Sequence, residues 1–122
     1  MTQSYTIDLP IPPSTNRLWR KFRGRIVKSP EYKTWITEAG WCIQAFKAGN
    51  ITGPVEIDIA VGKSRIDLDN QAKSVIDALV RHHIIVGDGP RIVQKVTLRR
   101  DLSLPGCRVT VTAIESALRG AA

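Results

Sequence analysis

The stretch that decides the fold is SRIDLDNQAKSVIDALV, residues 64–80, where an extended pattern changes into a helical one. Just before it, residues 53–62 alternate apolar and polar side chains, as expected of a half-buried strand. From Asn70 onward the apolar residues recur at helical spacing, which predicts a helix. Two aspartates, Asp67 and Asp69, stand one residue apart at this junction, although a helix start needs only one capping side chain.

Further strands and a second helix are expected on either side of this junction. The expected elements are a strand over 4–9, a hairpin over 18–28 with its turn at Arg23-Gly24, and strands within 91–101 and 106–115 joined by a turn around Pro105-Gly106. A helix should begin at Pro30, with Ser29 as its N-cap and Gly49 as its stop. The 122 residues suffice for one core, which predicts a small single α/β domain over 1–122, a mixed β-sheet packed with two main helices.

The composition excludes some classes of protein. No apolar run reaches the roughly 18 residues that cross a bilayer, and the N-terminus lacks a signal-peptide pattern. A soluble, cytoplasmic protein with no membrane partner is therefore expected. Cys42 and Cys107 lie far apart in apolar-patterned segments, which favours free, buried thiols over a disulfide or a metal site.

Positive charge is concentrated in one segment of a chain whose formal charge is +7. The cluster, which contains no acidic residue, consists of Arg17, Arg20, Lys21, Arg23, Arg25 and Lys28. Such a cluster favours a polyanionic partner, nucleic acid first and a membrane surface second, although a merely solvated basic face fits the same charges. Trp19 and Phe22, interleaved with the cations, suit either stacking on exposed bases or packing on the core.

The two aspartates at the junction allow two interpretations. In an extended segment, residues i and i+2 point to the same side, so Asp67 and Asp69 should project together and repel each other. A hard cation such as Mg²⁺ relieves that repulsion, because it is usually held by one or two carboxylates together with substrate phosphate. In the purely structural interpretation, Asp69 caps the helix and Asp67 is a solvated turn residue.

Polar neighbours favour the metal interpretation. Asn70 can supply an amide oxygen, and Lys73, four residues after Asp69, can reach the carboxylates or a phosphate near them. Asp88 stands in a glycine-flanked loop, where an ordinary Asp-Gly turn is the alternative. The strand, helix and next strand should form a βαβ-like crossover, which can bring Asp88 back towards the strand end that precedes the helix.

Three further titratable residues have mainly structural interpretations. Asp77 lies one helical turn after Lys73 and is read first as its salt-bridge partner. His82 and His83 stand at the expected end of the helix, where a capping or surface role is favoured over catalysis.

Four segments, taken in order, resemble the RusA family of Holliday-junction resolvases. They read LPIPPSTNRLWR, GRIVKSPEYKTW, DLDNQAKSVIDAL and VGDGPRI, and the resemblance runs from about residue 5 to residue 114. It implies a small homodimeric, Mg²⁺-dependent endonuclease of α/β fold that acts on four-way DNA junctions.

The resemblance also implies roles for particular residues. The family's essential acidic residues fall on Asp67, Asp69 and Asp88, and its functional lysine falls on Lys73. Asn16 and Asn70 occupy further motif positions. One departure concerns the loop Gly87-Asp88, where the family's best-known pattern has two adjacent acidic residues, so Asp88 is the sole candidate ligand there.

The sequence thus predicts a Mg²⁺-dependent crossover junction endodeoxyribonuclease, bacterial or prophage-encoded, that resolves four-way junctions by paired symmetric nicks in recombination and repair. Asp67, Asp69 and Asp88 would hold the metal and act with Lys73 in catalysis. The predicted DNA-binding residues are Asn16, Arg17, Arg20, Lys21, Arg23, Arg25, Lys28 and Asn70.

Two alternatives remain open at this point. The first is a non-catalytic, basic module that binds DNA junctions. The second is another metal-dependent phosphoryl or glycosyl transferase, against which stands the lack of a nucleotide-binding glycine loop.

Overall fold

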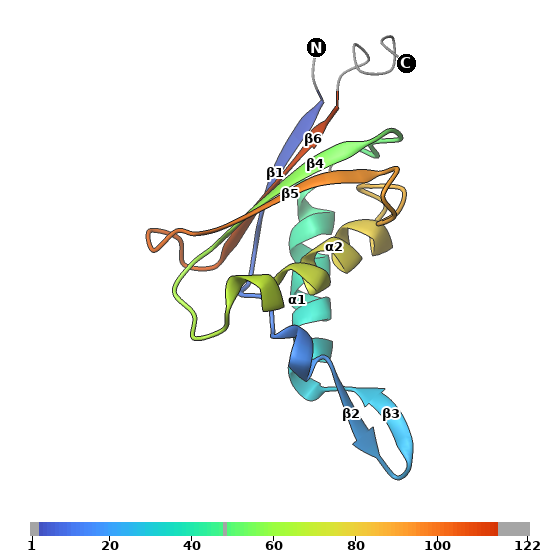
Figure 1. The fold of residues 1–122 in the computed structure, drawn as a ribbon, viewed down its shortest axis with the longest axis vertical. Coiled ribbons are helices and arrows are strands. Elements are labelled where there is room, and N and C mark those ends of the chain that lie inside the picture. Colours follow the sequence, from blue (N-terminus) through green and yellow to red (C-terminus); the bar gives the residue numbers. More distant parts are fainter. Residues whose placement is uncertain (1–2, 48, 115–122) are drawn as a thin grey trace.

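A computed structural model describes residues 3–47 and 49–114 of the chain. Two helices cover one face of a four-stranded sheet in an α/β fold (Figure 1). The sheet has the order β1-β6-β4-β5 and consists of β1 Ser4–Leu9, β4 Val55–Val61, β5 Val93–Arg100 and β6 Cys107–Ala113. The helices are α1 Pro30–Phe46 and α2 Ala72–Arg81. The mixed sheet and the two helices agree with the prediction from the sequence.

The unit β4-α2-β5 is the predicted βαβ crossover. β4 and β5 run parallel, with Val55 opposite Val93 and Val61 opposite Arg100. Their carboxyl ends therefore meet at one edge of the sheet, where the loop into α2 leaves β4. The loop after α2 reaches the other edge, where β5 begins (Figure 1). The two loops that flank α2 thus lie at opposite edges of the sheet.

The last two strands, although joined by the turn around Pro105-Gly106, do not form a hairpin. β4 lies between them, parallel to β5 and antiparallel to β6. The connection from β5 to β6 therefore crosses the carboxyl end of β4. It passes so close that a Cβ on Gly62 would collide with the carbonyl oxygen of Leu104, so only glycine fits at that position.

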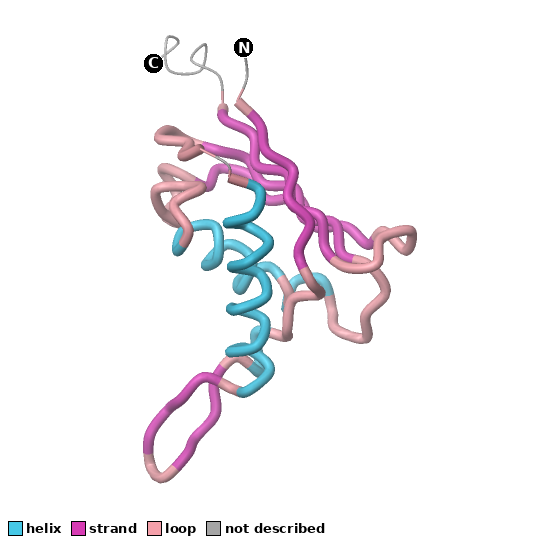
Figure 2. Tube along the Cα trace, turned by 180° about the vertical axis from the view of Figure 1, so that it is seen from behind, coloured by secondary structure: helices cyan, strands magenta, loops and turns pink. Residues whose placement is uncertain are grey.

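A separate hairpin projects away from the sheet and the helices (Figure 2). It consists of β2 Trp19–Phe22 and β3 Arg25–Lys28. The turn residues Arg23 and Gly24 have φ of 53° and 76°, and two residues at positive φ are what a two-residue type I′ turn requires. The hairpin and its turn were both predicted from the sequence and are confirmed.

The first helix, α1, begins where predicted and ends earlier. Ser29 is the N-cap, and its Oγ accepts a hydrogen bond of 3.2 Å from the backbone N–H of Tyr32. At the other end Lys47 has a left-handed φ of 55° and terminates the helix after Phe46, so the predicted stop at Gly49 is wrong. Within residues 3–47 and 49–114, neither helix is long and apolar enough to span a bilayer.

Between the sheet and the helices lies the hydrophobic core. Ile57 and Ile59 of β4 are buried in it, together with Trp35 of α1 and Leu79 of α2. The indole N–H of Trp35 donates a 3.0 Å hydrogen bond to the carbonyl of Pro10. Trp41 of the same helix is 68% exposed and lies outside the core.

Both cysteines are free, as predicted. Cys107 is buried, and burial raises the pKa of its thiol to about 12. Cys42 is only partly buried. A thiol that stays protonated at neutral pH is a poor nucleophile and metal ligand, so Cys107 behaves as a small apolar core residue.

Candidate functional site

Asp67 and Asp69 lie in the loop that leaves the carboxyl end of β4. Asp67 precedes a short 3-10 helix, η2 Leu68–Asn70, and Asp69 lies within it. Gln71 then precedes α2, and neither Asp67 nor Gln71 makes a capping hydrogen bond with its side chain. The interpretation of Asp69 as the helix cap is therefore wrong. The predicted helix start is instead split into a 3-10 turn and a helix that begins two residues later.

None of the side chains that the structure describes pairs with the carboxylate of Asp67 or of Asp69. Both residues are exposed. In the part of the chain that the structure describes, which does not include the Arg17 side chain, no group forms a hydrogen bond or an ion pair with either carboxylate. Two unneutralised carboxylates in one short turn repel each other. Because both carboxylates are exposed, they are accessible to a cation from solution.

The donor atoms of this turn suit a hard divalent cation. Mg²⁺ is usually bound through one or two carboxylates, with waters and substrate phosphate as the other ligands. Asp67 and Asp69 supply that number of carboxylates. Asn70, which follows directly and is half-buried, carries an amide oxygen of the same hard type. These residues therefore form a suitable set of Mg²⁺ ligands, which leaves coordination positions for water and for a substrate phosphate.

In the structure Lys73 pairs with Asp77 and not with Asp69. Its ammonium lies 3.7 Å from a carboxylate oxygen of Asp77, one helical turn further on, which confirms the predicted salt bridge. Asp69 and Lys73 are four residues apart, but α2 begins only after Gln71, so the two do not share a helix. The Lys73 side chain is 56% exposed and remains accessible to a ligand from solution.

Asp88 lies at the opposite end of α2 from Asp67 and Asp69. Ten helical residues span about 15 Å, and they separate the loop before α2 from the loop that carries Asp88 (Figure 1). Within residues 3–47 and 49–114, no three acidic, histidine or cysteine side chains gather closely enough to hold a metal ion. The crossover therefore does not bring Asp88 back towards the end of β4, because parallel strands place the two loops at opposite edges of the sheet.

The histidines mark the end of α2. His82 is the C-cap residue, and its backbone N–H donates a 3.1 Å hydrogen bond to the carbonyl of Ala78. Its ring is half-buried against Gly40 of α1, and burial lowers the pKa of His82. His83 follows at a φ of 61°. The predicted position of both residues at the helix end is confirmed, and α2 separates them from Asp67 and Asp69.

The hairpin presents cations and apolar rings together. Its exposed cations are Arg20, Lys21, Arg23 and Arg25, whereas Lys28 is half-buried, and no carboxylate pairs with these five among residues 3–47 and 49–114. The Arg17 side chain lies outside the part of the chain that the structure describes. Phe22 is 50% exposed beneath the guanidinium of Arg23, 5.3 Å from its ring centre. Trp19 is 52% exposed and meets Tyr32 edge-on. Packing of Phe22 on the core is thus ruled out.

The base of the hairpin adjoins the acidic turn. A second 3-10 helix, η1 Thr15–Arg17, precedes β2, and the hydroxyl of Thr15 donates a 3.0 Å hydrogen bond to the carbonyl of Asn70. Asn16 is exposed on η1, one residue from this contact. The motif positions Asn16 and Asn70, which are far apart in sequence, therefore lie on two adjoining turns. The hairpin follows η1 on one side of this contact, and the acidic turn carries Asn70 on the other.

Two residues that support the acidic turn were not predicted from the sequence. Arg100 donates hydrogen bonds to backbone carbonyls of the loop that precedes η2, and Gln71 is fully buried next to it. The sequence did contain a signal for Arg100. Val96, Leu98 and Arg100 occupy every second position of β5 on the inner face of the sheet, so Arg100 is a cation where an apolar residue would be expected. No comparable signal marked Gln71.

Comparisons with known proteins place the chain in a family. Residues 10–112 match the family model described as endodeoxyribonuclease RusA. The chain is 31% identical over 88 residues to the crossover junction endodeoxyribonuclease RusA of Aquifex aeolicus, covering 69% of both chains. It is 37% identical over 82 residues to the proteins of the same name from Escherichia coli K12 and Shigella sonnei, covering 64% of this chain and 68% of those proteins.

Proposed function

Because the chain belongs to the RusA family of endodeoxyribonucleases, we propose that it resolves four-way DNA junctions by paired, Mg²⁺-dependent nicks. One observation carries this proposal: Asp67 and Asp69 are exposed, no side chain that the structure describes pairs with them, and their turn adjoins the base of a basic hairpin. Two exposed carboxylates in one turn contribute little to stability. Their place beside a cationic arm suits a nuclease, which must hold a metal against an anionic strand.

In the proposed site, the charges of the carboxylates and of Lys73 act on the DNA phosphate, the carboxylates through the bound cation. Asp67 and Asp69 would hold the cation, which, when bound, polarises the phosphate, activates a water and stabilises the leaving oxygen. Lys73, exposed on the first turn of α2, would stabilise the negative charge that develops on the phosphoryl oxygens. The exposed salt bridge between Lys73 and Asp77 is weak, so Lys73 would exchange Asp77 for the phosphate at little cost.

The hairpin would supply affinity for the junction arms. Arg20, Lys21 and Arg23 are exposed cations, which contact phosphates without reading the base sequence. Phe22 and Trp19 present accessible rings that suit stacking on bases unpaired at the branch point. Because phosphate contacts and stacking depend little on base sequence, such binding would recognise the branched shape of the DNA more than its sequence.

A homodimer follows from the requirements of the reaction and from the position of Asp88. Two symmetric nicks need two sites related by a two-fold axis, whereas one chain carries one Asp67-Asp69 pair. Asp88 lies too far along α2 to join that pair within its own chain. We infer that Asp88 of the partner subunit completes each metal site, so that the two active sites straddle the dimer interface.

The proposed activity is tested with a synthetic four-way junction and a matched linear duplex, each incubated with Mg²⁺ or with EDTA. We expect paired nicks in the junction only, and only with Mg²⁺. Junction binding without nicking under any metal condition would instead identify a non-catalytic binding module. Equal nicking of the linear duplex would contradict the selectivity for branched DNA.

The shared site is tested by mixing Asp69→Asn and Asp88→Asn subunits, each inactive alone. In a mixed dimer, a site built across the interface combines the intact Asp69 of one subunit with the intact Asp88 of the other. Random mixing makes half of the dimers mixed, each with one intact site of two, so about one quarter of the wild-type sites should return. On a supercoiled cruciform plasmid the expected product is the singly nicked circle. No recovery after mixing would place the whole site within one chain.

A further inference from the structure

Gln71 is a completely buried polar residue between η2 and α2. Its amide nitrogen donates hydrogen bonds to the carbonyl of Pro12, at 3.0 Å, and to the hydroxyl of Ser64, at 3.3 Å. A buried amide must find such partners, because an unpaired one would lose the hydrogen bonds that it makes in water. Gln71 thereby joins three segments: the start of α2, the loop after β4 and the connection that leads to the hairpin.

Arg100 holds the same loop from the neighbouring strand. Its guanidinium donates to the carbonyl of Gly62 at 2.9 Å and to the carbonyl of Ile66 at 2.8 Å. A third, longer contact of 3.5 Å reaches the amide oxygen of Gln71. Hydrogen bonds from a charged, planar donor are both strong and directional. One side chain therefore fixes the two ends of the segment 62–66, directly before Asp67.

The position of Arg100 in β5 explains this contact. It lies opposite Val61, the last residue of β4, on the inner face of the sheet. The inner-face residue two positions before it, Leu98, packs against the core. Arg99, by contrast, points to the outer face and pairs with Asp58. Two adjacent arginines thus serve opposite faces, and only Arg100 reaches the loop.

Two further hydrogen bonds complete the support. The Ser64 hydroxyl accepts a 3.1 Å hydrogen bond from the backbone N–H of Ile66, and the Thr15 hydroxyl donates to the carbonyl of Asn70. The residues on both sides of the Asp67–Asp69 segment are therefore held, while the two carboxylates are exposed. We call Arg100, Gln71, Ser64 and Thr15 the polar clasp.

We infer that the polar clasp positions Asp67 and Asp69 for the metal, with Arg100 as its principal positioning residue. This inference rests on the proposed function for the identity of the ligand. Without Arg100, repulsion between the carboxylates would drive the turn apart, and a cation would have to restore its shape on binding. Preorganisation of ligands in this way is what supporting residues contribute at metal sites. Because Pro12 and Thr15 lead into the hairpin, the clasp also fixes the metal turn relative to the DNA-binding arm.

The test compares Arg100→Gln with Arg99→Gln, which removes the same charge from the adjacent residue but leaves the clasp intact. We expect Arg100→Gln to raise the Mg²⁺ concentration for half-maximal nicking by about 10–100-fold, with partial recovery at high Mg²⁺. Junction affinity in EDTA should change less than about twofold in both variants, because Arg100 contacts the loop and not the DNA. Arg99→Gln should match the wild type in its Mg²⁺ requirement. Equal Mg²⁺ requirements in the two variants would overturn the inference.

Amide hydrogen exchange tests the clasp without DNA or metal. In Arg100→Gln the amides of residues 62–71 should exchange faster than in Arg99→Gln, and those of β4 should not. If Arg100→Gln folds poorly, Thr15→Val removes a single hydrogen bond at the edge of the clasp and should raise the Mg²⁺ requirement in the same direction by a smaller factor. Unchanged exchange over 62–71 would overturn the clasp, whatever the nicking assays show. Absence of nicking by the wild type, with the exchange difference present, would instead reject the proposed function alone.

Discussion

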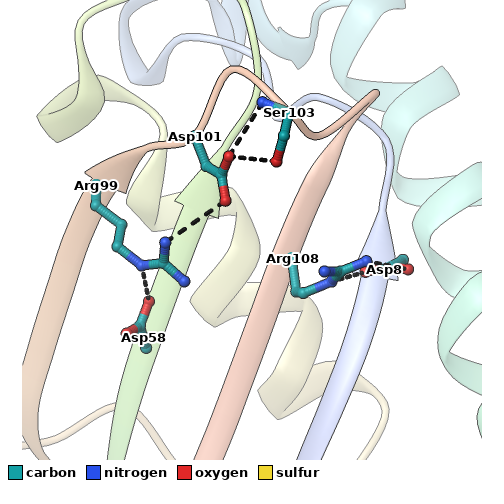
Figure 3. A network of polar contacts seen from close by, with 6 residues as sticks. All are labelled: Asp8, Asp58, Arg99, Asp101, Ser103 and Arg108. Atoms are coloured by element: carbon teal, nitrogen blue, oxygen red, sulfur yellow. Dashed lines mark hydrogen bonds and ion pairs between the residues drawn. The ribbon is translucent and has the colours of Figure 1, made fainter.

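The carboxylates on the outer face of the sheet and those of the acidic turn before α2 differ in whether they form ion pairs. On the sheet face the carboxylates of Asp8, Asp58 and Asp101 each have a partner (Figure 3). Asp8 accepts hydrogen bonds from Arg108, the shorter being 2.7 Å, and these bonds lower the pKa of Asp8. At the acidic turn no side chain that the structure describes, Arg17 thus excepted, pairs with Asp67 or Asp69.

We propose that the difference separates charges that serve the fold from charges that serve a ligand. The same contrast holds for cations, because Arg99 and Arg108 pair across the sheet while the hairpin cations face solvent. Composition alone does not reveal this division, since both regions contain Asp and Arg. The partners of each charge reveal it, and the division can be tested residue by residue.

The largest expected effect is on cleavage in Asp69→Asn. Nicking of a four-way junction should fall by at least about 10²–10³-fold, because the variant removes a metal-holding carboxylate. Junction binding in EDTA should be unchanged or tighter, since a negative charge near the phosphates is lost. The matched control is Asp58→Asn on the sheet face, which should nick normally. Full activity in both Asp67→Asn and Asp69→Asn would show that the acidic turn, like the outer face of the sheet, is not the metal site.

A triple replacement of Arg20, Lys21 and Arg23 by Gln should weaken junction binding and flatten its salt dependence. Each lost phosphate contact reduces the slope of log affinity against log salt by about 0.9, so a reduction of about 2–3 is expected. Binding assays at several salt concentrations measure it. Replacing the paired Arg108 by Gln gives the control, for which the slope should stay the same. An equal slope for wild type and triple variant would place the DNA surface elsewhere.

A smaller effect is expected on the thermal stability that Mg²⁺ confers in the absence of DNA. At ten times its dissociation constant, a ligand adds about 1.4 kcal/mol to the free energy of unfolding, which raises Tm by roughly 3–6 °C. The wild type should show this rise if the Asp67-Asp69 pair alone binds the cation. Asp67→Asn should lose it and Asp8→Asn should keep it. A rise that persists in Asp67→Asn would locate the cation at other residues.

The smallest effect is expected for Asp8→Asn on the sheet face. Because its pKa is lowered in the folded state, Asp8 contributes stability above about pH 4 that disappears as the carboxyl is protonated at lower pH. The pair with Arg108 is exposed, so Tm should fall by only about 2 °C or less at pH 7, with a smaller difference from wild type at pH 3. Thermal melts at the two pH values measure this. A difference that grows towards acid pH would contradict the sign.

Local signals in the sequence predicted most of the secondary structure. The type I′ turn at Arg23-Gly24 and the cap at Ser29 each depend on a few neighbouring residues, and both are present. The end of α1 was misplaced because Lys47 adopts the left-handed conformation that Gly49 was expected to supply. Positive φ is uncommon for lysine, so the residue type did not indicate it.

Long-range placement was harder to predict. Nothing local shows that β4 inserts between β5 and β6, because strand order depends on pairing across the whole chain. The separation of Asp88 from Asp69 has the same origin, since it follows from the parallel register of β4 and β5. Gln71 was missed for a different reason: its burial depends on the backbone carbonyl of Pro12, which carries no sequence signal.

The length of α2 also bears on how the protein would behave when dilute. If each catalytic centre combines residues from opposite ends of this helix in two different chains, a single subunit contains two partial sites and no complete one. Specific activity would then decline steeply once the concentration drops below the point at which subunits separate, and an unpaired subunit would leave the chromosome uncut.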